Sequence, residues 1–73
     1  MKEYRNIFKE KTEEELIVLY KQFLESEKLG YIPDNELGQI RDEYWEYFKT
    51  NMLLMLQIDL MHTISDLWFK NKI

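Results

Sequence analysis

The chain of 73 residues contains no cysteine, one proline, two glycines and one histidine. Without cysteine, no disulfide can stabilise the fold, and no obvious cluster of ligands offers a structural metal site. A chain of this length hides only roughly 60–65% of its unfolded surface when it folds alone. Small domains therefore depend on a disulfide, a metal or a second subunit. We expect oligomerisation to supply the missing stability.

Catalytic motifs are also missing. The sequence has no Gly-rich phosphate loop, no nucleophile elbow and no suggestive spacing of histidine with serine or cysteine. The carboxylates Glu36, Asp42, Glu43 and Glu46 do not indicate acid–base catalysis, which needs one buried and one solvated carboxylate. We expect them on a solvated helix face beside Arg41. The sequence predicts a protein that is not an enzyme and that binds no cofactor and no small-molecule substrate.

Targeting and membrane signals are weak. Met1-Lys2-Glu3 is not followed by the apolar segment of a signal peptide, and the lack of cysteine fits a reducing compartment. The apolar stretch 51–61 is shorter than the about 20 residues that cross a membrane, and it contains Gln57 and Asp59. We therefore expect a cytoplasmic protein with no membrane partner.

Basic residues are scarce in the middle of the chain. Residues 1–11 carry four bases and two acids, residues 12–48 carry three bases and ten acids, and residues 49–73 carry three bases and two acids. The net charges are +2, −7 and +1. Binding to a phosphate backbone requires clustered Lys and Arg, so a nucleic-acid partner is disfavoured. A basic protein partner, mimicry of a nucleic acid and a merely solvated helix face all fit the acidic middle.

The few helix-breaking residues predict an all-α fold. We expect a helical hairpin that forms a single domain over residues 1–73. Thr12 and Glu15 form a capping box that predicts a helix over 13–29, and three acids lie at its positive end. Gly30 and Pro33 bracket a turn over 30–33. Tyr4, Ile7 and Phe8 have helical spacing, which predicts a short helix or arm over 2–10.

A long C-terminal helix is predicted over 34–70, with Asp34 as its cap. Thr50-Asn51 is only a dip in helix propensity, so a continuous helix and a break near residue 50 both remain open. A continuous helix would extend roughly 54 Å, whereas a compact chain of this length is only about 30 Å across. The apolar stretch would then project past the hairpin, where the arm covers only one side of residues 53–60.

The uncovered side predicts a second chain. The simplest second chain is another copy, paired two-fold into a helical bundle, and a dissimilar partner is the competing interpretation. The residues expected at this homodimer interface are Met52, Met55, Leu56, Leu60, Ile64, Leu67 and Trp68.

Two further groups of residues suggest binding sites. Aromatic and acidic residues are mixed over residues 42–47, and they predict a docking surface for a larger protein. Its residues are Asp42, Glu43, Trp45, Glu46 and Tyr47. Asp59, His62 and Asp66 share one helical face, but one helix seldom offers enough ligands, so we interpret His62 as a boundary residue paired with an acid and predict no metal.

The stretch TEEELIVLYKQFLESEKL, the turn and the stretch NELGQIRDEY resemble the helical hairpin of the Sda-like sporulation checkpoint inhibitors, over about half of the chain. The shared features are the capped helix start, Leu16-Ile17 followed by Tyr20, and Leu37 with Ile40. These small bacterial proteins bind and block a sensor histidine kinase, so the resemblance implies inhibition of such a kinase. This sequence departs from the family in its basic N-terminal arm and its apolar C-terminal extension, and no residue roles are carried over.

Two functions follow as expectations. The first is a small acidic, non-catalytic module that binds a larger protein and regulates or inhibits it, a class that includes antitoxins and phage or mobile-element antagonists of host machinery. The second is a structural or assembly subunit, whose C-terminal helix drives homo-oligomerisation.

Overall fold

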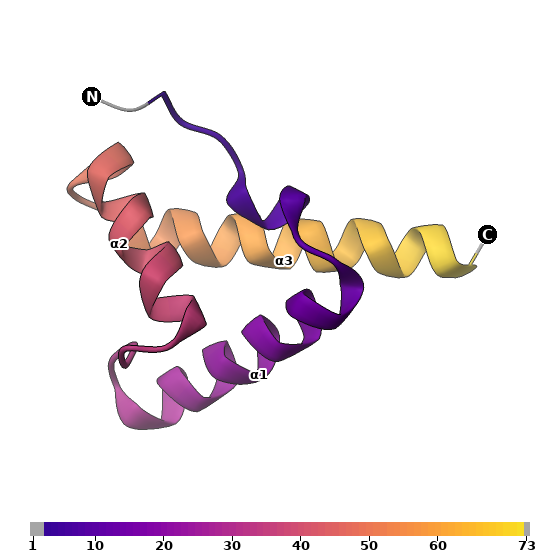
Figure 1. The fold of residues 1–73 in the computed structure, drawn as a ribbon, viewed down its shortest axis with the longest axis horizontal. Coiled ribbons are helices and arrows are strands. Elements are labelled where there is room, and N and C mark those ends of the chain that lie inside the picture. Colours follow the sequence, from indigo (N-terminus) through magenta and orange to yellow (C-terminus); the bar gives the residue numbers. More distant parts are fainter. Residues whose placement is uncertain (1–2, 73) are drawn as a thin grey trace.

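A computed structural model describes residues 3–72, and it is all-α, with no strand among those residues (Figure 1). A 3₁₀ turn, η1, spans Ile7–Glu10 and precedes three helices. Helix α1 spans Glu13–Leu29, α2 spans Glu36–Phe48 and α3 spans Met52–Lys72. The predicted all-helical class is therefore confirmed.

Helix α1 begins and ends where its local signals place it. The Thr12 side chain accepts a hydrogen bond from the Glu15 backbone N–H at 3.2 Å, and the Glu15 carboxylate accepts one from the Thr12 N–H at 2.9 Å. Each side chain thus satisfies a backbone donor that the first helical turn leaves unpaired. The helix ends at Gly30, whose φ of 83° lies in the left-handed region that favours glycine. The predicted helix over 13–29 is confirmed.

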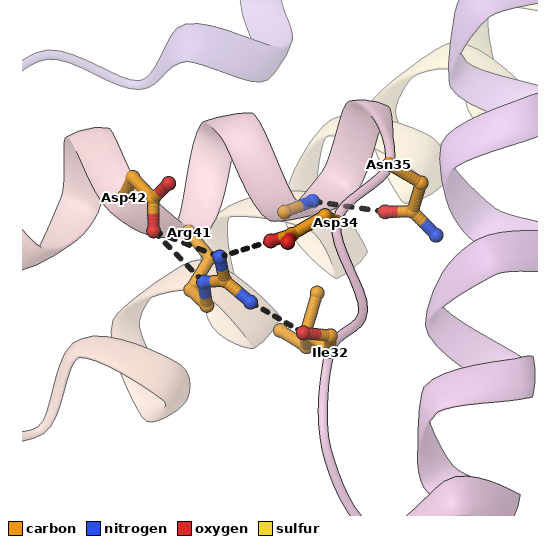
Figure 2. A network of polar contacts seen from close by, with 6 residues as sticks. Ile32, Asp34, Asn35, Arg41 and Asp42 are labelled. Carbon is orange, nitrogen blue, oxygen red and sulfur yellow. Dashed lines mark hydrogen bonds and ion pairs between the residues drawn. The ribbon is translucent and has the colours of Figure 1, made fainter.

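A polar network closes the turn between α1 and α2. The Arg41 guanidinium donates to the Ile32 carbonyl and forms ion pairs with Asp34 at 3.4 Å and with Asp42 at 2.9 Å (Figure 2). The prediction that Asp34 caps the next helix was wrong. Asn35 is the cap, because its Oδ1 accepts a hydrogen bond from the Gly38 N–H at 2.9 Å.

Glycine at position 38 lets the turn pack directly on the first turn of α2. A Cβ at this position would lie 2.3 Å from the Pro33 carbonyl oxygen, far inside van der Waals contact. The backbone of the turn can therefore approach α2 this closely only because residue 38 has no side chain.

The long C-terminal helix is broken, so its continuous form was wrong. Between α2 and α3, Lys49 and Asn51 adopt positive φ angles of 58° and 60°, which no helical residue has. Asparagine adopts such angles more readily than most residues, so Asn51 is a suitable place for the reversal. The break returns α3 across the fold, and the Cα extents are only 37 × 30 × 17 Å.

Helices α1 and α3 pack side by side and run in opposite directions. The beginning of α1 lies beside Ile64 and Trp68, and its end lies beside Leu53 and Leu56. Helix α2 makes its most extensive contacts with α3, which it crosses near the N-terminal end of α3 (Figure 1). The expectation that the apolar stretch would project past the hairpin was wrong, because that expectation required a continuous last helix.

One hydrophobic core joins all four elements. Phe8, Leu37, Tyr44, Leu56 and Leu60 have no exposed surface. The other buried hydrophobic residues are Ile7, Leu16, Leu19, Ile32 and Ile40. The N-terminal arm therefore contributes to the core through Ile7 and Phe8, as its spacing predicts. Its described part has no helix or strand before η1, so it is helical only in η1, and residue 2, where the predicted segment begins, lies outside the described residues.

Candidate protein-interaction surfaces

The outer face of α2 carries three of the predicted partner-binding residues. Trp45 is 50% exposed, and Asp42 and Glu46 are exposed. Residues three and four apart are neighbours on a helix, so these side chains share one face. Asp42 forms an ion pair with Arg41 in the turn network. Glu46, the residue after Trp45, is therefore the carboxylate most available beside the tryptophan. The opposite face of α2 is fixed in the core by Tyr44 and Leu37.

The other two predicted partner-binding residues, Glu43 and Tyr47, lie on the side of α2 that faces the N-terminal arm. They line a hollow together with Glu3, Tyr4 and Arg5. The Tyr47 ring is half-buried and packs edge-on against Tyr4, with ring centroids 5.8 Å apart. Tyr47 therefore helps to hold the arm, and the structure does not bring all five predicted residues onto one face.

A buried carboxylate joins three elements. Asp59 of α3 accepts hydrogen bonds at one oxygen from the Tyr44 hydroxyl at 2.6 Å and from the Tyr4 hydroxyl at 2.5 Å. Asn6 adds a second link to α3, because its amide donates to the Thr63 hydroxyl, which in turn donates to the Asp59 carbonyl. The sequence predicts neither partner for Asp59. The only signal was a single acid within an apolar stretch.

This arrangement alters the ionisation of both tyrosines. Burial, followed by the hydrogen bond to Asp59 and the charge of that carboxylate, raises the pKa of Tyr4 to about 12. The same causes in the same order raise the pKa of Tyr44 well above its usual range. Ionising either hydroxyl would place a second negative charge beside a carboxylate, which explains the direction of both shifts.

The face that carries Asp59, His62 and Asp66 does not assemble a metal site among residues 3–72. Asp59 turns into the core toward the two tyrosines, whereas His62 and Asp66 are exposed. Because one carboxylate is already occupied by two hydroxyl donors, the three side chains do not converge on a common point.

The predicted dimer-interface residues occupy different environments in the single chain. Leu56 and Leu60 have no exposed surface, so they belong to the core of their own chain and offer nothing to a second copy. Their assignment to an interface therefore does not fit the structure. Trp68 is 55% exposed. The half-buried remainder comprises Met52, Met55, Ile64 and Leu67.

A different set of residues faces outward on α3. We define the outer stripe as Leu54, Ile58, Met61, Ser65 and Trp68, which follow one another at intervals of four and three residues. Leu54 is 54% exposed and Ile58 is 38% exposed. Ser65 is exposed and Met61 is half-buried. This spacing is that of a coiled-coil seam, and it is visible in the sequence. The sequence alone does not show that the face carrying Asp59, rather than this one, turns inward.

An apolar groove of about 230 Å³ flanks the outer stripe. It runs between the first half of α1 and the second half of α3, and Trp68 belongs to both the groove and the stripe. Its apolar walls include Ile17 and Tyr20 of α1, which are 48% and 37% exposed. The outer stripe and the groove therefore form neighbouring parts of one apolar surface.

Comparisons with protein-family models, with curated proteins and with solved structures give no match to this chain. Within the described residues, no helix has both the length and the apolar character required to cross a membrane.

Proposed function

We propose that this chain is a small non-catalytic module that binds a larger protein and regulates or inhibits it. The observation that carries the proposal is Trp45, which is half exposed on a helix whose opposite face is locked in the core. A tryptophan in a fixed position loses little side-chain freedom on binding, and tryptophan is enriched among the residues that dominate binding energy. The outer face of α2 thus has the character of a preformed anchor.

The charge around this anchor supports a partner with a basic surface. Helices α1 and α2 lie within residues 12–48, where the net charge is −7, and Glu46 is exposed next to Trp45. An acidic surface with an aromatic centre favours a basic protein surface with an apolar pocket, because complementary charges steer association. The same charge disfavours nucleic acid. The resemblance to the Sda-like inhibitors makes a sensor histidine kinase one such larger protein, as a proposal.

The proposal of a non-catalytic role is supported by what the polar groups do. The carboxylate of Asp59 accepts two tyrosine hydroxyls in the core, and Asp42 pairs with Arg41. No buried side-chain nitrogen or oxygen in the described part lacks a hydrogen-bond partner. These polar groups are thus engaged in holding the fold together.

Affinity capture from the native cell tests the proposal. Wild-type protein, Trp45→Ala and Gln39→Ala are compared, because Gln39 is also exposed on α2 and serves as a matched control. We expect one dominant protein to be retained by wild type and Gln39→Ala and to be reduced at least about tenfold with Trp45→Ala, since an anchor of this kind contributes about 2 kcal/mol. Equal capture by all three variants would contradict the proposal.

A second candidate function is an assembly subunit, and the observation that favours it is the outer stripe of α3. Variants expressed in the same native cells distinguish the two functions. If Ile58→Glu abolishes both assembly and biological activity while Trp45→Ala changes neither, the assembly function is supported. The choice of Ile58 matters, because a charge at the fully buried Leu56 would unfold the chain and distinguish nothing.

A further inference from the structure

The outer stripe of α3 has an apolar surface that residues 3–72 leave uncovered. Six large apolar side chains on the stripe and beside it are 37–59% exposed, namely Leu54, Ile58, Trp68, Phe69, Ile17 and Tyr20. At roughly 150–250 Å² for a large side chain, half of this surface amounts to roughly 450–750 Å². The largest apolar patch on a typical monomer is about 300–600 Å², whereas a stable dimer buries about 800 Å² on each partner.

We infer that the outer stripe binds the outer stripe of a second copy of this chain, with the two α3 helices antiparallel. The inference concerns a different surface from that around Trp45, so it holds or fails independently of the proposed function. It also differs from the interface expected from the sequence, because Leu56 and Leu60 are inside each copy and Leu54 and Ile58 replace them at the contact.

Charge favours an identical copy over other occupants. Coiled-coil partners are normally selected by charges beside the seam, but here the flanking positions hold Gln57, His62, Ile64 and Phe69. The stripe and these flanking positions hold no Asp, Glu, Lys or Arg, so they neither repel a copy nor select a charged partner, and the neighbouring groove adds one residue of each sign, Glu13 and Lys21. A lipid surface fits less well, because membrane-surface helices carry Lys and Arg on their polar face, whereas residues 12–48 carry −7.

The antiparallel direction follows from charge and from side-chain size. Helix α2 lies at the N-terminal end of α3, so an antiparallel pair places the two acidic α2 helices at opposite ends (Figure 1). At 1.5 Å per residue, α3 spans roughly 32 Å, which is several times the screening length of about 8–10 Å. An offset that sets Met61 against the small Ser65 of the other copy also sets Ile58 against its Trp68. A parallel pair would instead oppose serine to serine.

Sedimentation equilibrium of the full chain tests the pairing. We expect a mass of twice 9.1 kDa that dissociates on dilution. Ile58→Glu should raise the dissociation constant of the dimer at least about 100-fold, because it buries a charge in the contact. Ile17→Glu should raise the dissociation constant, whereas the matched control Val18→Glu should leave it unchanged. Both residues are nearly half exposed, but only Ile17 borders the groove. A 9.1 kDa species at all accessible concentrations overturns the inference, as does an unchanged mass for Ile58→Glu.

Cysteine crosslinking tests the direction, and the natural chain contributes no cysteine of its own. Under mild oxidation, Met61→Cys with Ser65→Cys should give covalent dimers at least tenfold faster than either single variant, because only the pair aligns across the antiparallel contact. Gln39→Cys on α2 is the background control. Single variants that crosslink as fast as the pair contradict the antiparallel arrangement. Monomers that bind neutral phosphatidylcholine vesicles through Ile58 would assign the stripe to lipid and overturn the inference.

Discussion

At the scale of single residues, Asp59 has the largest structural role that the sequence conceals. Its carboxylate connects the arm through Tyr4 and α2 through Tyr44, and it lies in the middle of α3. A polar side chain is buried at low cost only when its hydrogen bonds are satisfied, and here two hydroxyls satisfy one oxygen. The pattern of apolar residues would place a lone acid on the wet face. The inward rotation of this face therefore cannot be read from the pattern, and it decides which leucines are inside.

Removing the two tyrosine hydroxyls should have unequal effects. Tyr44→Phe deletes a fully buried hydrogen bond to a carboxylate, and we expect the free energy of unfolding to fall by about 2 kcal/mol. Tyr4 is 44% exposed, so water can replace its hydroxyl and Tyr4→Phe should cost less than about 1 kcal/mol. Urea unfolding followed by circular dichroism measures both. Equal effects would show that the carboxylate is not buried as described.

The same two hydroxyls predict a loss of stability at alkaline pH. The pKa of Tyr4 is 10.0 when unperturbed and about 12 in the fold, so the folded chain keeps this proton where the unfolded chain releases it. The stabilisation is therefore complete below pH 10 and is lost as pH rises toward 12, and the raised pKa of Tyr44 acts in the same direction.

The control for this pH dependence is the double variant Tyr4→Phe, Tyr44→Phe. Its difference in unfolding free energy from wild type should stay constant between pH 8 and about 10 and shrink above that range. Lysine titration affects both proteins equally and cancels in the comparison. A difference that grows with pH would have the wrong sign for hydroxyls held protonated by Asp59.

At the scale of elements, local signals predict α1 well and the end of α2 poorly. Thr12, Glu15 and Gly30 form complete start and stop signals, and α1 begins and ends between them. Between α2 and α3 no glycine or proline marks the reversal, and Lys49 takes a positive φ although nothing in its own chemistry favours it. Packing of α3 against α2 and the arm overrides local propensity there, so the sequence locates a possible break near residue 50 but does not decide whether the helix breaks.

Glycine substitution tests this break, because the two interpretations predict opposite signs. In the structure Lys49 has φ 58° and ψ −53°, a conformation that glycine adopts without steric cost. We expect Lys49→Gly to raise the free energy of unfolding by about 1 kcal/mol. The matched control Lys21→Gly lies in the middle of α1 and should lower it by about 1 kcal/mol. If Lys49→Gly destabilises the chain as much as Lys21→Gly does, residue 49 is helical and the break is misplaced.

At the scale of the whole molecule, the reversal at residues 49–51 determines which surfaces are available for binding. Because α3 returns across α1, α2 and η1, its inward face completes the core and its outer stripe faces away. The sequence predicts that the arm covers one side of the apolar stretch, and the arm does contribute Ile7 and Phe8 to the core that contains Leu56 and Leu60. The sequence overestimates the part left for a partner, since the premise of a helix longer than the domain does not hold.

The most direct test of this reversal is the distance between α2 and the end of α3. Spin labels at Gln39→Cys and Lys70→Cys, both exposed positions, are introduced into the Ile58→Glu background so that a second copy does not contribute. A continuous helix would separate these residues by roughly 46 Å. The folded-back chain predicts a distribution centred no farther than about the 37 Å longest dimension of the fold. A distribution centred near 46 Å would contradict the fold, and with it the assignment of the outer stripe.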